Sequence, residues 1–321
     1  MIAQDETKRG KVTASSLFGK YGILFVFIIV CVLLAITAPN FVKPANLLNV
    51  FKQVSLVGIM ATGMTFVIIA ADIDLSVGSV AALAGVLTAG FEVNMGMPLA
   101  LAIIIALAIS VGIGASMGLI ITKTKVHAFV VSLGMMTIVR GICFLLTNGY
   151  PISGVSESFV KIGGGNVAGV PNLVFYLAAA IIIGYIVLTK TPFGRNVYAV
   201  GGNLTATRLA GINVDKVRIT NFMISSFCAA MAGILLASRV SSGQPVASQG
   251  AELDAIAAVV IGGTSMYGGR GSMLGTLVGA LFLGVIQNGL NLLQVSPYYQ
   301  QIFTGSLIII AVIIDSIKKE D

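Results

Sequence analysis

Two aspartates interrupt an otherwise apolar part of the chain, and they are the first residues that could do chemistry. Asp72 and Asp74 lie in the stretch AADIDLSVGS, between two long apolar runs. Acids within a membrane-spanning region are energetically costly and tend to be functional, which favours a polar pathway or a gate. Alternatively, Asp74 or Ser76 caps the helix that follows by accepting hydrogen bonds from free backbone N–H groups. No second acid-rich segment accompanies them, so the sequence does not favour a proton relay.

Arg140 lies well inside another apolar run, FVVSLGMMTIVRGICFLLT. A guanidinium in such a place needs a carboxylate or a backbone carbonyl as its partner. One interpretation is a structural ion pair with Asp72 or Asp74. The other is that the long side chain extends to the outer membrane interface, where its charge remains hydrated.

A further group of polar side chains is concentrated late in one apolar run: Gln287, Asn288, Asn291 and Gln294. Such side chains either form hydrogen bonds between helices or line a path for a polar solute. The candidates for a translocation path or gate are therefore Asp72, Asp74, Arg140, Asn288 and Asn291. Two more acids, Glu252 and Asp254, open the stretch ELDAIAAVVIGGT and are explained by the favourable interaction of acids with a helix N-terminus.

Glycines at a spacing of four residues mark two further segments, Gly114 with Gly118 and the series Gly271, Gly275 and Gly279. This spacing lets the backbones of transmembrane helices approach closely. The pattern predicts tight helix packing, either within the chain or between subunits.

No motif for catalysis or nucleotide binding is present in the sequence. GxxxxGK[ST] is missing, as are HExxH and GxSxG. The single histidine, His127, cannot form a multi-histidine metal site. We therefore expect a chain that is not an enzyme and has no catalytic residue, no metal site and no bound cofactor.

The composition is that of an integral membrane protein. Hydrophobic residues make up 57% of the 321 residues, the mean hydropathy is +1.00, and only 10% of the residues are charged. A soluble domain carries about 25% charged residues. The net charge of +7 is explained by basic cytoplasmic loops beside lipid rather than by nucleic-acid binding, because no basic run with interleaved aromatics is present.

Apolar segments predict an all-α polytopic bundle of about ten transmembrane helices, one or more of them short or broken. The expected segments are 21–38, 55–71, 77–93, 98–121, 126–147, 172–189, 219–240, 253–263, 272–294 and 298–315. The segment 253–263 is too short for a full crossing. Residues 67–85 and 259–279 share a pattern of apolar run, break, Gly-Ser and apolar run, which would suit a repeat with broken helices.

The distribution of lysine and arginine sets the expected orientation. Basic residues gather before the first segment, in residues 190–218 and at the C-terminus, so both termini are expected to be cytoplasmic. The chain then divides into a cytoplasmic segment 1–20, a membrane domain 21–316 and a cytoplasmic tail 317–321. The Gly-, Ser- and Asn-rich residues 148–171 read as an exposed loop on the outer side.

Residues 190–218 form a polar and basic island between two apolar runs. They hold five basic residues against a single acid, Asp215. The local pattern predicts a turn, then a short helix over Leu204 to Leu209, then a glycine stop. The turn residues are Gly201, Gly202 and Asn203, and the stop is Gly211. A structured helix in a cytoplasmic loop indicates a docking element.

This island resembles a known family. VYAVGGNLTATRLAGINVDKVRI is similar to the cytoplasmic coupling segment of permease subunits in bacterial sugar ABC importers of the ribose/xylose/galactose type. ADIDLSVGSVAALAG, VHAFVVSLGMMTIVRG and ELDAIAAVVIGGTSMYGGRGSMLGTLVGALFLGVIQNGLNLL resemble the same family at corresponding positions. The resemblance covers about residues 40–316 and is strongest to the ribose type.

The resemblance implies a multi-pass permease in the bacterial cytoplasmic (inner) membrane that passes a monosaccharide. It implies a cytoplasmic ATP-binding subunit that uses ATP and Mg, a periplasmic or lipoprotein sugar-binding protein, and a second permease subunit, as a homodimer. The residues expected in the ATPase-coupling segment are Gly201, Gly202, Asn203, Ala206, Arg208 and Gly211. The alternative is a secondary active sugar transporter or a facilitator without an ATPase. Ion coupling would need ionisable groups near the membrane midplane, and only Asp72, Asp74 and Arg140 could serve.

Overall fold

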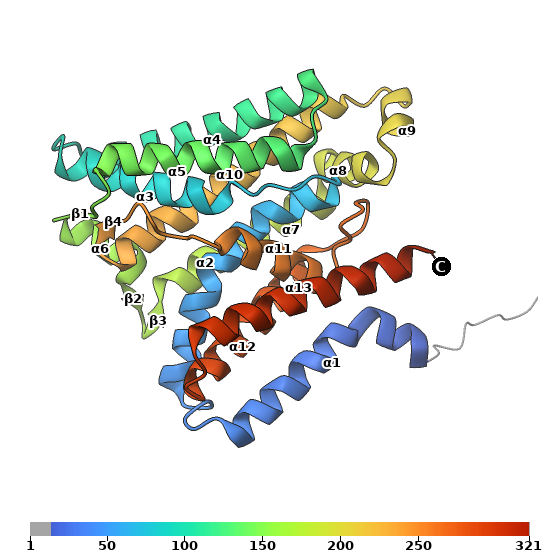
Figure 1. Cartoon of the computed structure of the whole chain (residues 1–321), viewed down its shortest axis with the longest axis horizontal. Coiled ribbons are helices and arrows are strands. Elements are labelled where there is room, and N and C mark those ends of the chain that lie inside the picture. The colour runs from blue at the N-terminus through green and yellow to red at the C-terminus, as the bar shows by residue number, and fades with distance from the viewer. Residues whose placement is uncertain (1–13, 321) are drawn as a thin grey trace, which may run out of the picture.

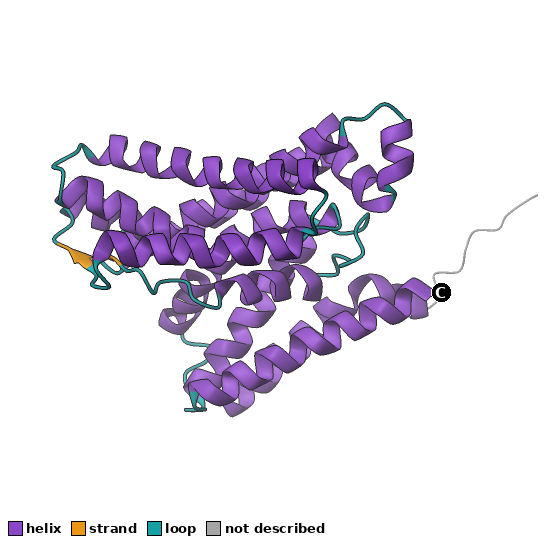
Figure 2. Cartoon of the chain, turned by 45° about the horizontal axis from the view of Figure 1, so that its top comes forward, coloured by secondary structure: helices purple, strands orange, loops and turns teal. Residues whose placement is uncertain are grey.

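The computed structural model describes residues 14–320. Residues 1–13 of the expected segment 1–20, and Asp321 of the expected tail 317–321, lie outside the described residues. Figure 2 shows that the described chain is almost entirely helical.

The long helices of the first half follow one another with short connections. They are α1 (Ala14–Thr37), α2 (Pro44–Ile69), α3 (Val77–Val93), α4 (Leu99–Thr124) and α5 (Ala128–Thr147). The second half alternates long helices with short ones. These are α6 (Glu157–Gly164), α7 (Asn172–Lys190), α8 (Pro192–Gly202), α9 (Leu204–Leu209), α10 (Val214–Arg239), α11 (Ala251–Ile261), α12 (Met273–Leu292) and α13 (Pro297–Glu320).

Six of the described helices are long and apolar enough to cross a membrane: α2, α4, α5, α7, α10 and α12. Three further apolar stretches are shorter, at residues 24–37, 77–93 and 297–313. The chain is therefore an all-α membrane protein, as predicted. Helix α11 has 11 residues and is therefore too short for a full crossing, as predicted for the segment 253–263.

One predicted boundary is wrong, and one helix is missing from the prediction. Helix α2 begins at Pro44 rather than near residue 55. The fixed φ of Pro44 suits the first turn of a helix. Helix α8 was not predicted at all, and Gly201 and Gly202 form its last turn instead of a turn between elements.

Helices α2 and α10 occupy the centre of the bundle. Helix α10 packs against α2, α3 and α4, and α2 also contacts α7, α11 and α12. The glycine patterns serve contacts within the chain. Gly114 and Gly118 of α4 face the α10 backbone at Phe222 and Ile219. On α12, Gly275 and Gly279 face the α11 end in the same way, whereas Gly271 lies in the preceding loop.

The predicted outer loop 148–171 is more structured than expected. It contains α6 and the short strands β1 (Ile152–Ser153), β2 (Asn166–Val167) and β3 (Val170–Pro171), and β1 pairs with β4 (Ser242–Gly243). Phe159 of α6 is fully buried. The Ser238 hydroxyl of α10 accepts a hydrogen bond from the Gly163 N–H (2.6 Å) and donates one to the Phe159 carbonyl (2.5 Å). Most residues of this segment are exposed, as expected, but α6 and the short strands give it more regular structure than a loop.

Figure 1 shows two distinct ends of the bundle. The strands and α6 lie at one end, whereas α8, α9, the start of α1 and the end of α13 lie at the other. Both stretches that share the sequence pattern are helix–break–helix units. Helices α2 and α3 are separated by residues 70–76, and α11 and α12 by residues 262–272.

Candidate functional site

Helices α8 and α9 form a compact hairpin whose ends are set by local capping. The Thr191 hydroxyl accepts the Gly194 N–H (3.2 Å) and Pro192 occupies the first turn, which starts α8. The Asn203 carboxamide oxygen accepts the Ala206 N–H (2.9 Å) and starts α9. Gly211, with φ +81°, adopts the left-handed conformation after α9.

One side of α9 is anchored and the other is free. The Thr207 side chain is buried, and its hydroxyl donates to the Ala199 carbonyl of α8 (2.7 Å). The opposite side exposes Leu209, which is 85% exposed, and Arg208, whose side chain is 60% exposed. Arg208 and Asp215 form an ion pair at 3.4 Å, and such an exposed pair adds little stability. The free side of α9 therefore presents an apolar and a basic group, with the small Ala206 also exposed.

Helix α8 seats this hairpin against two other segments through glycine backbones. The Gly269 N–H donates to the carbonyl of Ile69, the last residue of α2 (2.8 Å). A Cβ on Gly201 would collide with the Ile69 carbonyl and the Gly269 nitrogen. The end of α8, the end of α2 and the loop between α11 and α12 thus meet at backbone distance. We call this contact of Ile69, Gly201 and Gly269 the glycine junction.

Tyr198 makes a further contact beside the glycine junction. Its hydroxyl donates to the Gly271 carbonyl (2.8 Å). Burial raises the pKa of the Tyr198 phenol, so the hydroxyl remains protonated and able to donate at neutral pH. Helix α8 is therefore tied to the 262–272 loop by a side chain as well as by backbone packing.

The break between α2 and α3 is clamped to α10. The Arg218 guanidinium donates to both carboxylate oxygens of Asp72 (2.6 and 2.8 Å), with both side chains largely buried. Two turns further along α10, the Ser225 hydroxyl donates to Asp74 (2.8 Å). A bidentate arginine–carboxylate pair fixes orientation as well as distance. The two aspartates therefore hold this break against one face of α10.

The capping expected of the Asp74 region takes a different form from the one predicted. Asp74 is fully buried, and its carboxylate accepts the Ser76 N–H (2.9 Å) and the Ser76 hydroxyl (2.6 Å). Ser76 stands at the N-cap of α3, but its side chain makes no capping hydrogen bond there. Asp74 thus orders the turn that leads into α3.

Arg140 pairs with neither aspartate, so the predicted alternative of an ion pair with Asp72 or Asp74 is wrong. Its guanidinium donates to the carbonyls of Pro245 (2.6 Å) and Ala247 (2.9 Å). Arg140 thereby holds the loop between β4 and α11 inside the bundle. Backbone carbonyls satisfy a guanidinium without the cost of burying a second charge.

The amides of α12 bond to neighbouring helices. Asn288 and Asn46 of α2 exchange two amide hydrogen bonds (2.8 and 2.9 Å). Asn291 accepts from Gln300 of α13 (2.8 Å). These contacts brace α12 between α2 and α13.

Helix α13 anchors the 262–272 loop. The Asp315 carboxylate accepts the Ser265 hydroxyl (3.0 Å) and the Met266 N–H (2.9 Å). No sequence signal marks Asp315, Tyr198 or Arg218, because their partners lie far away in the sequence and no local motif surrounds them. Together they connect α13, the 262–272 loop, α8, α2 and α10 into one network at the α9 end of the bundle.

Comparison with known proteins identifies the family. Residues 46–312 match the family described as branched-chain amino acid transport system / permease component. The chain is 45% identical to the ribose import permease protein RbsC of Haemophilus influenzae, over 90% of this chain and 92% of the relative. It is 43% identical to the Bacillus subtilis ribose import permease protein RbsC, over 98% of each chain.

Another relative carries a different sugar in its name. The chain is 41% identical to the L-arabinose transport system permease protein AraH of Escherichia coli, over 95% of this chain and 92% of the relative. No solved structure matches the chain. The extent of the matched region and the identity to these relatives show that the chain belongs to this family of membrane permeases and is a transport subunit rather than an enzyme.

Proposed function

We propose that this chain is the permease subunit of an ATP-driven importer for a monosaccharide, ribose or a similar pentose or hexose. The observation that carries the proposal is α9, a short helix with one side fixed on α8 and the other side free. Relatives named as ribose and arabinose permeases support the choice of substrate class. ATP and Mg would be used by a separate cytoplasmic subunit, and this chain would bind no cofactor itself.

The end of the bundle that holds α8 and α9 also sets the orientation that we propose for the chain in the membrane. We propose ten crossings, made by α1, α2, α3, α4, α5, α7, α10, α11, α12 and α13, of which α11 is partial. The basic segment 190–218 and the described ends of α1 and α13 share one end of the bundle in Figure 1. Placing this end in the cytoplasm of a bacterial inner membrane satisfies the preference of lysine and arginine for the cytoplasmic side.

The glycine junction gives α9 a mechanical connection to the membrane helices. A movement of the docked ATPase would displace α9 and α8 as one body, since Thr207 joins them. Gly201 would pass that displacement to the end of α2 and to the 262–272 loop. The Asp72–Arg218 clamp would extend it to α10. We propose that Gly201, Gly202, Asn203, Ala206, Arg208 and Gly211 form the coupling segment on this basis.

The proposed path residues serve as supports for a gate rather than as groups that hold the sugar. Asp72, Asp74 and Arg140 all hold connecting segments in place, and Asn288 and Asn291 hold helix contacts. A gate needs such fixed attachments at the ends of its moving helices. On the outer side a sugar-binding protein would deliver the substrate, and a second copy of this chain would complete the path within the lipid bilayer.

The secondary-transporter alternative needs an ionisable group at the midplane that exchanges its ion. Asp72 is already neutralised by Arg218, and Arg140 is occupied by two carbonyls. Asp74 and Asp254 remain as ionisable groups inside the membrane domain, so the proposal of an ATP-driven function rests on α9 and on the relatives named as import permeases.

Assembly with the ATPase tests the proposal. The permease is purified with its candidate ATP-binding subunit and sugar-binding protein in lipid nanodiscs, and ATP hydrolysis is measured with and without sugar-loaded binding protein. We expect Arg208→Glu and Gly202→Pro to lose assembly or stimulation. Arg239→Glu, the same charge reversal at the far end of α10, serves as the matched control and should keep assembly. Equal assembly by Arg208→Glu and wild type would remove α9 from the docking site.

A further inference from the structure

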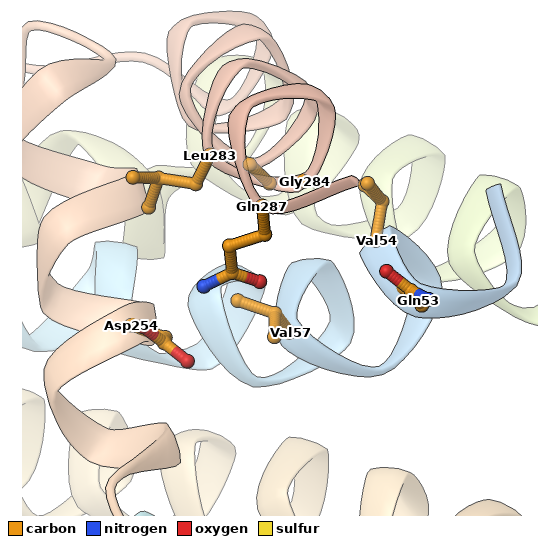
Figure 3. A pocket seen from close by; sticks show the side chains of 8 residues that line it. Gln53, Val54, Val57, Asp254, Leu283, Gly284 and Gln287 are labelled. Atoms are coloured by element: carbon orange, nitrogen blue, oxygen red, sulfur yellow. The ribbon is translucent and has the colours of Figure 1, made fainter. Parts of the chain in front are cut away.

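A small pocket in the membrane domain brings together a carboxylate and two carboxamides from three different helices. Its walls are formed by Gln53, Val54 and Val57 of α2, Asp254 of α11, and Ala280, Leu283, Gly284 and Gln287 of α12. Figure 3 shows the Gln287 amide pointing toward Asp254, with Val57 and Leu283 beside them. Mixed polar and apolar walls of this kind are typical of sites for small polar molecules.

The pocket lies within the depth of the bilayer rather than at its surface. Arg140 stands seven residues before the end of α5 at Thr147, which is about 10 Å at 1.5 Å per residue. Its bonds to Pro245 and Ala247 hold the loop that leads to α11 at that depth. Helix α11 therefore begins inside the membrane domain, and Asp254 lies in its first turn.

Neighbouring polar side chains on the same helices have partners, whereas Gln53 has none among the described residues. Asn46 pairs with Asn288, and Thr65 with Thr276 (2.7 Å). These pairs account for the packing of α2 against α12 without Gln53, whereas Gln287 of α12 donates a hydrogen bond to Asp254 of α11. A polar group inside a membrane domain that is not needed for packing marks a functional site.

The chemistry of the three side chains fits the hydroxyl groups of a neutral sugar. A carboxylate accepts hydrogen bonds from hydroxyls, and a carboxamide both donates and accepts. The space between them admits a group of the size of one water molecule, which suits a hydroxyl but not a sugar ring. Val57 and Leu283 offer an apolar surface for the C–H groups beside that hydroxyl.

We propose that Gln53, Asp254 and Gln287 form a subsite that binds hydroxyl groups of the sugar as it passes through the permease. This inference rests on the proposed function and names the residues by which that function would recognise its substrate. A cation is the less fitting occupant, since the pocket offers a single carboxylate and Ca²⁺ takes six to eight oxygen ligands.

The test combines variants of the pocket with sugars that lack one hydroxyl. The complete importer is reconstituted in proteoliposomes, and ATP-driven uptake of D-ribose and of each mono-deoxy analogue is measured with saturating binding protein. Asp254→Asn should lower ribose uptake roughly ten- to a hundredfold, the size expected when a hydrogen bond to a charged group is lost. Gln53→Met should lower it about three- to tenfold. Gln301→Met, an exposed site on α13, is the matched control and should leave uptake unchanged.

Discrimination between sugars separates recognition from a merely structural effect. The same binding protein serves every variant, so its own preference cancels in the ratio of variant to wild type. For at least one deoxy analogue, the loss caused by Asp254→Asn and the loss caused by the missing hydroxyl should not add, as in a double-mutant cycle. Additive losses for every analogue, or unchanged ribose uptake in both variants, would overturn the subsite.

Two measurements in the same vesicles keep this result distinct from a failure of the proposed function. ATP hydrolysis stimulated by loaded binding protein reports whether the importer has assembled, and it should persist in Gln53→Met even if Asp254→Asn fails to fold. Uptake is also compared in sodium and potassium buffers. A sodium requirement that Asp254→Asn abolishes would assign the pocket to a cation and contradict the sugar subsite.

Discussion

Adding one methyl group at Gly201 should disrupt the glycine junction, whereas the same change at the adjacent Gly202 should not. A Cβ at position 201 would meet the Ile69 carbonyl and the Gly269 nitrogen, and neither backbone atom can rotate away. A Cβ at position 202 would meet no atom within 4 Å. Both residues belong to α8, so the two substitutions share helix geometry and chemistry.

The expected free energies follow from this contrast. Over-packing of a fixed contact costs about 1–3 kcal/mol, and loss of the Gly269–Ile69 hydrogen bond (2.8 Å) adds about 1 kcal/mol. Replacing a helical glycine by alanine returns roughly 0.5–1 kcal/mol. Gly201→Ala should therefore destabilise the chain by about 1–3 kcal/mol. Gly202→Ala should be neutral or stabilising by up to about 1 kcal/mol.

Thermal unfolding of the isolated permease in detergent measures the difference, at one scan rate because membrane proteins often unfold irreversibly. The midpoint should fall for Gly201→Ala and should not fall for Gly202→Ala. In the assembled importer, Gly201→Ala should also hydrolyse more ATP per sugar transported. Equal midpoints for the two variants would refute the close backbone contact and the transmission route built on it.

Three further predictions concern the attachments around the glycine junction. Arg218→Met should destabilise the chain by about 3–5 kcal/mol because it leaves Asp72 buried without its cation, and restoration of the midpoint by adding Asp72→Asn would identify the pair as the cause. Asp315→Ala should raise the hydrogen exchange of the Met266 amide, whereas Ser306→Ala on the same helix should not. Tyr198→Phe should lower the stability of the chain by about 1 kcal/mol, because the hydrogen bond to the Gly271 carbonyl is lost. An unchanged unfolding midpoint would count against that hydrogen bond.

Features governed by neighbouring residues could be predicted from the sequence. Helix α9 appears at Leu204–Leu209 as predicted, because Asn203 caps its start and Gly211 provides the left-handed residue after it. The short α11 and the two broken helix pairs also follow from the lengths of apolar runs. Helix α8 was missed although Thr191 followed by Pro192 is a strong local start signal.

Contacts between distant parts of the chain could not be predicted in the same way. Asp72 finds Arg218 on α10, and Asp315 finds the 262–272 loop, only after the helices have packed. The same holds for Arg140, whose partners are carbonyls that carry no sequence signal. Gly201 looked like a turn residue, because the sequence cannot show that a second backbone approaches it.

Sugar uptake into proteoliposomes tests the central claim most directly. The chain is reconstituted alone and together with its ATP-binding subunit, with sugar-loaded binding protein on the outer face in both cases. We predict accumulation of ribose or a related sugar only when the ATP-binding subunit and internal ATP are both present, with loss of accumulation in Arg208→Glu. Sugar accumulation by the chain alone without ATP would contradict the account and assign the chain to secondary transport.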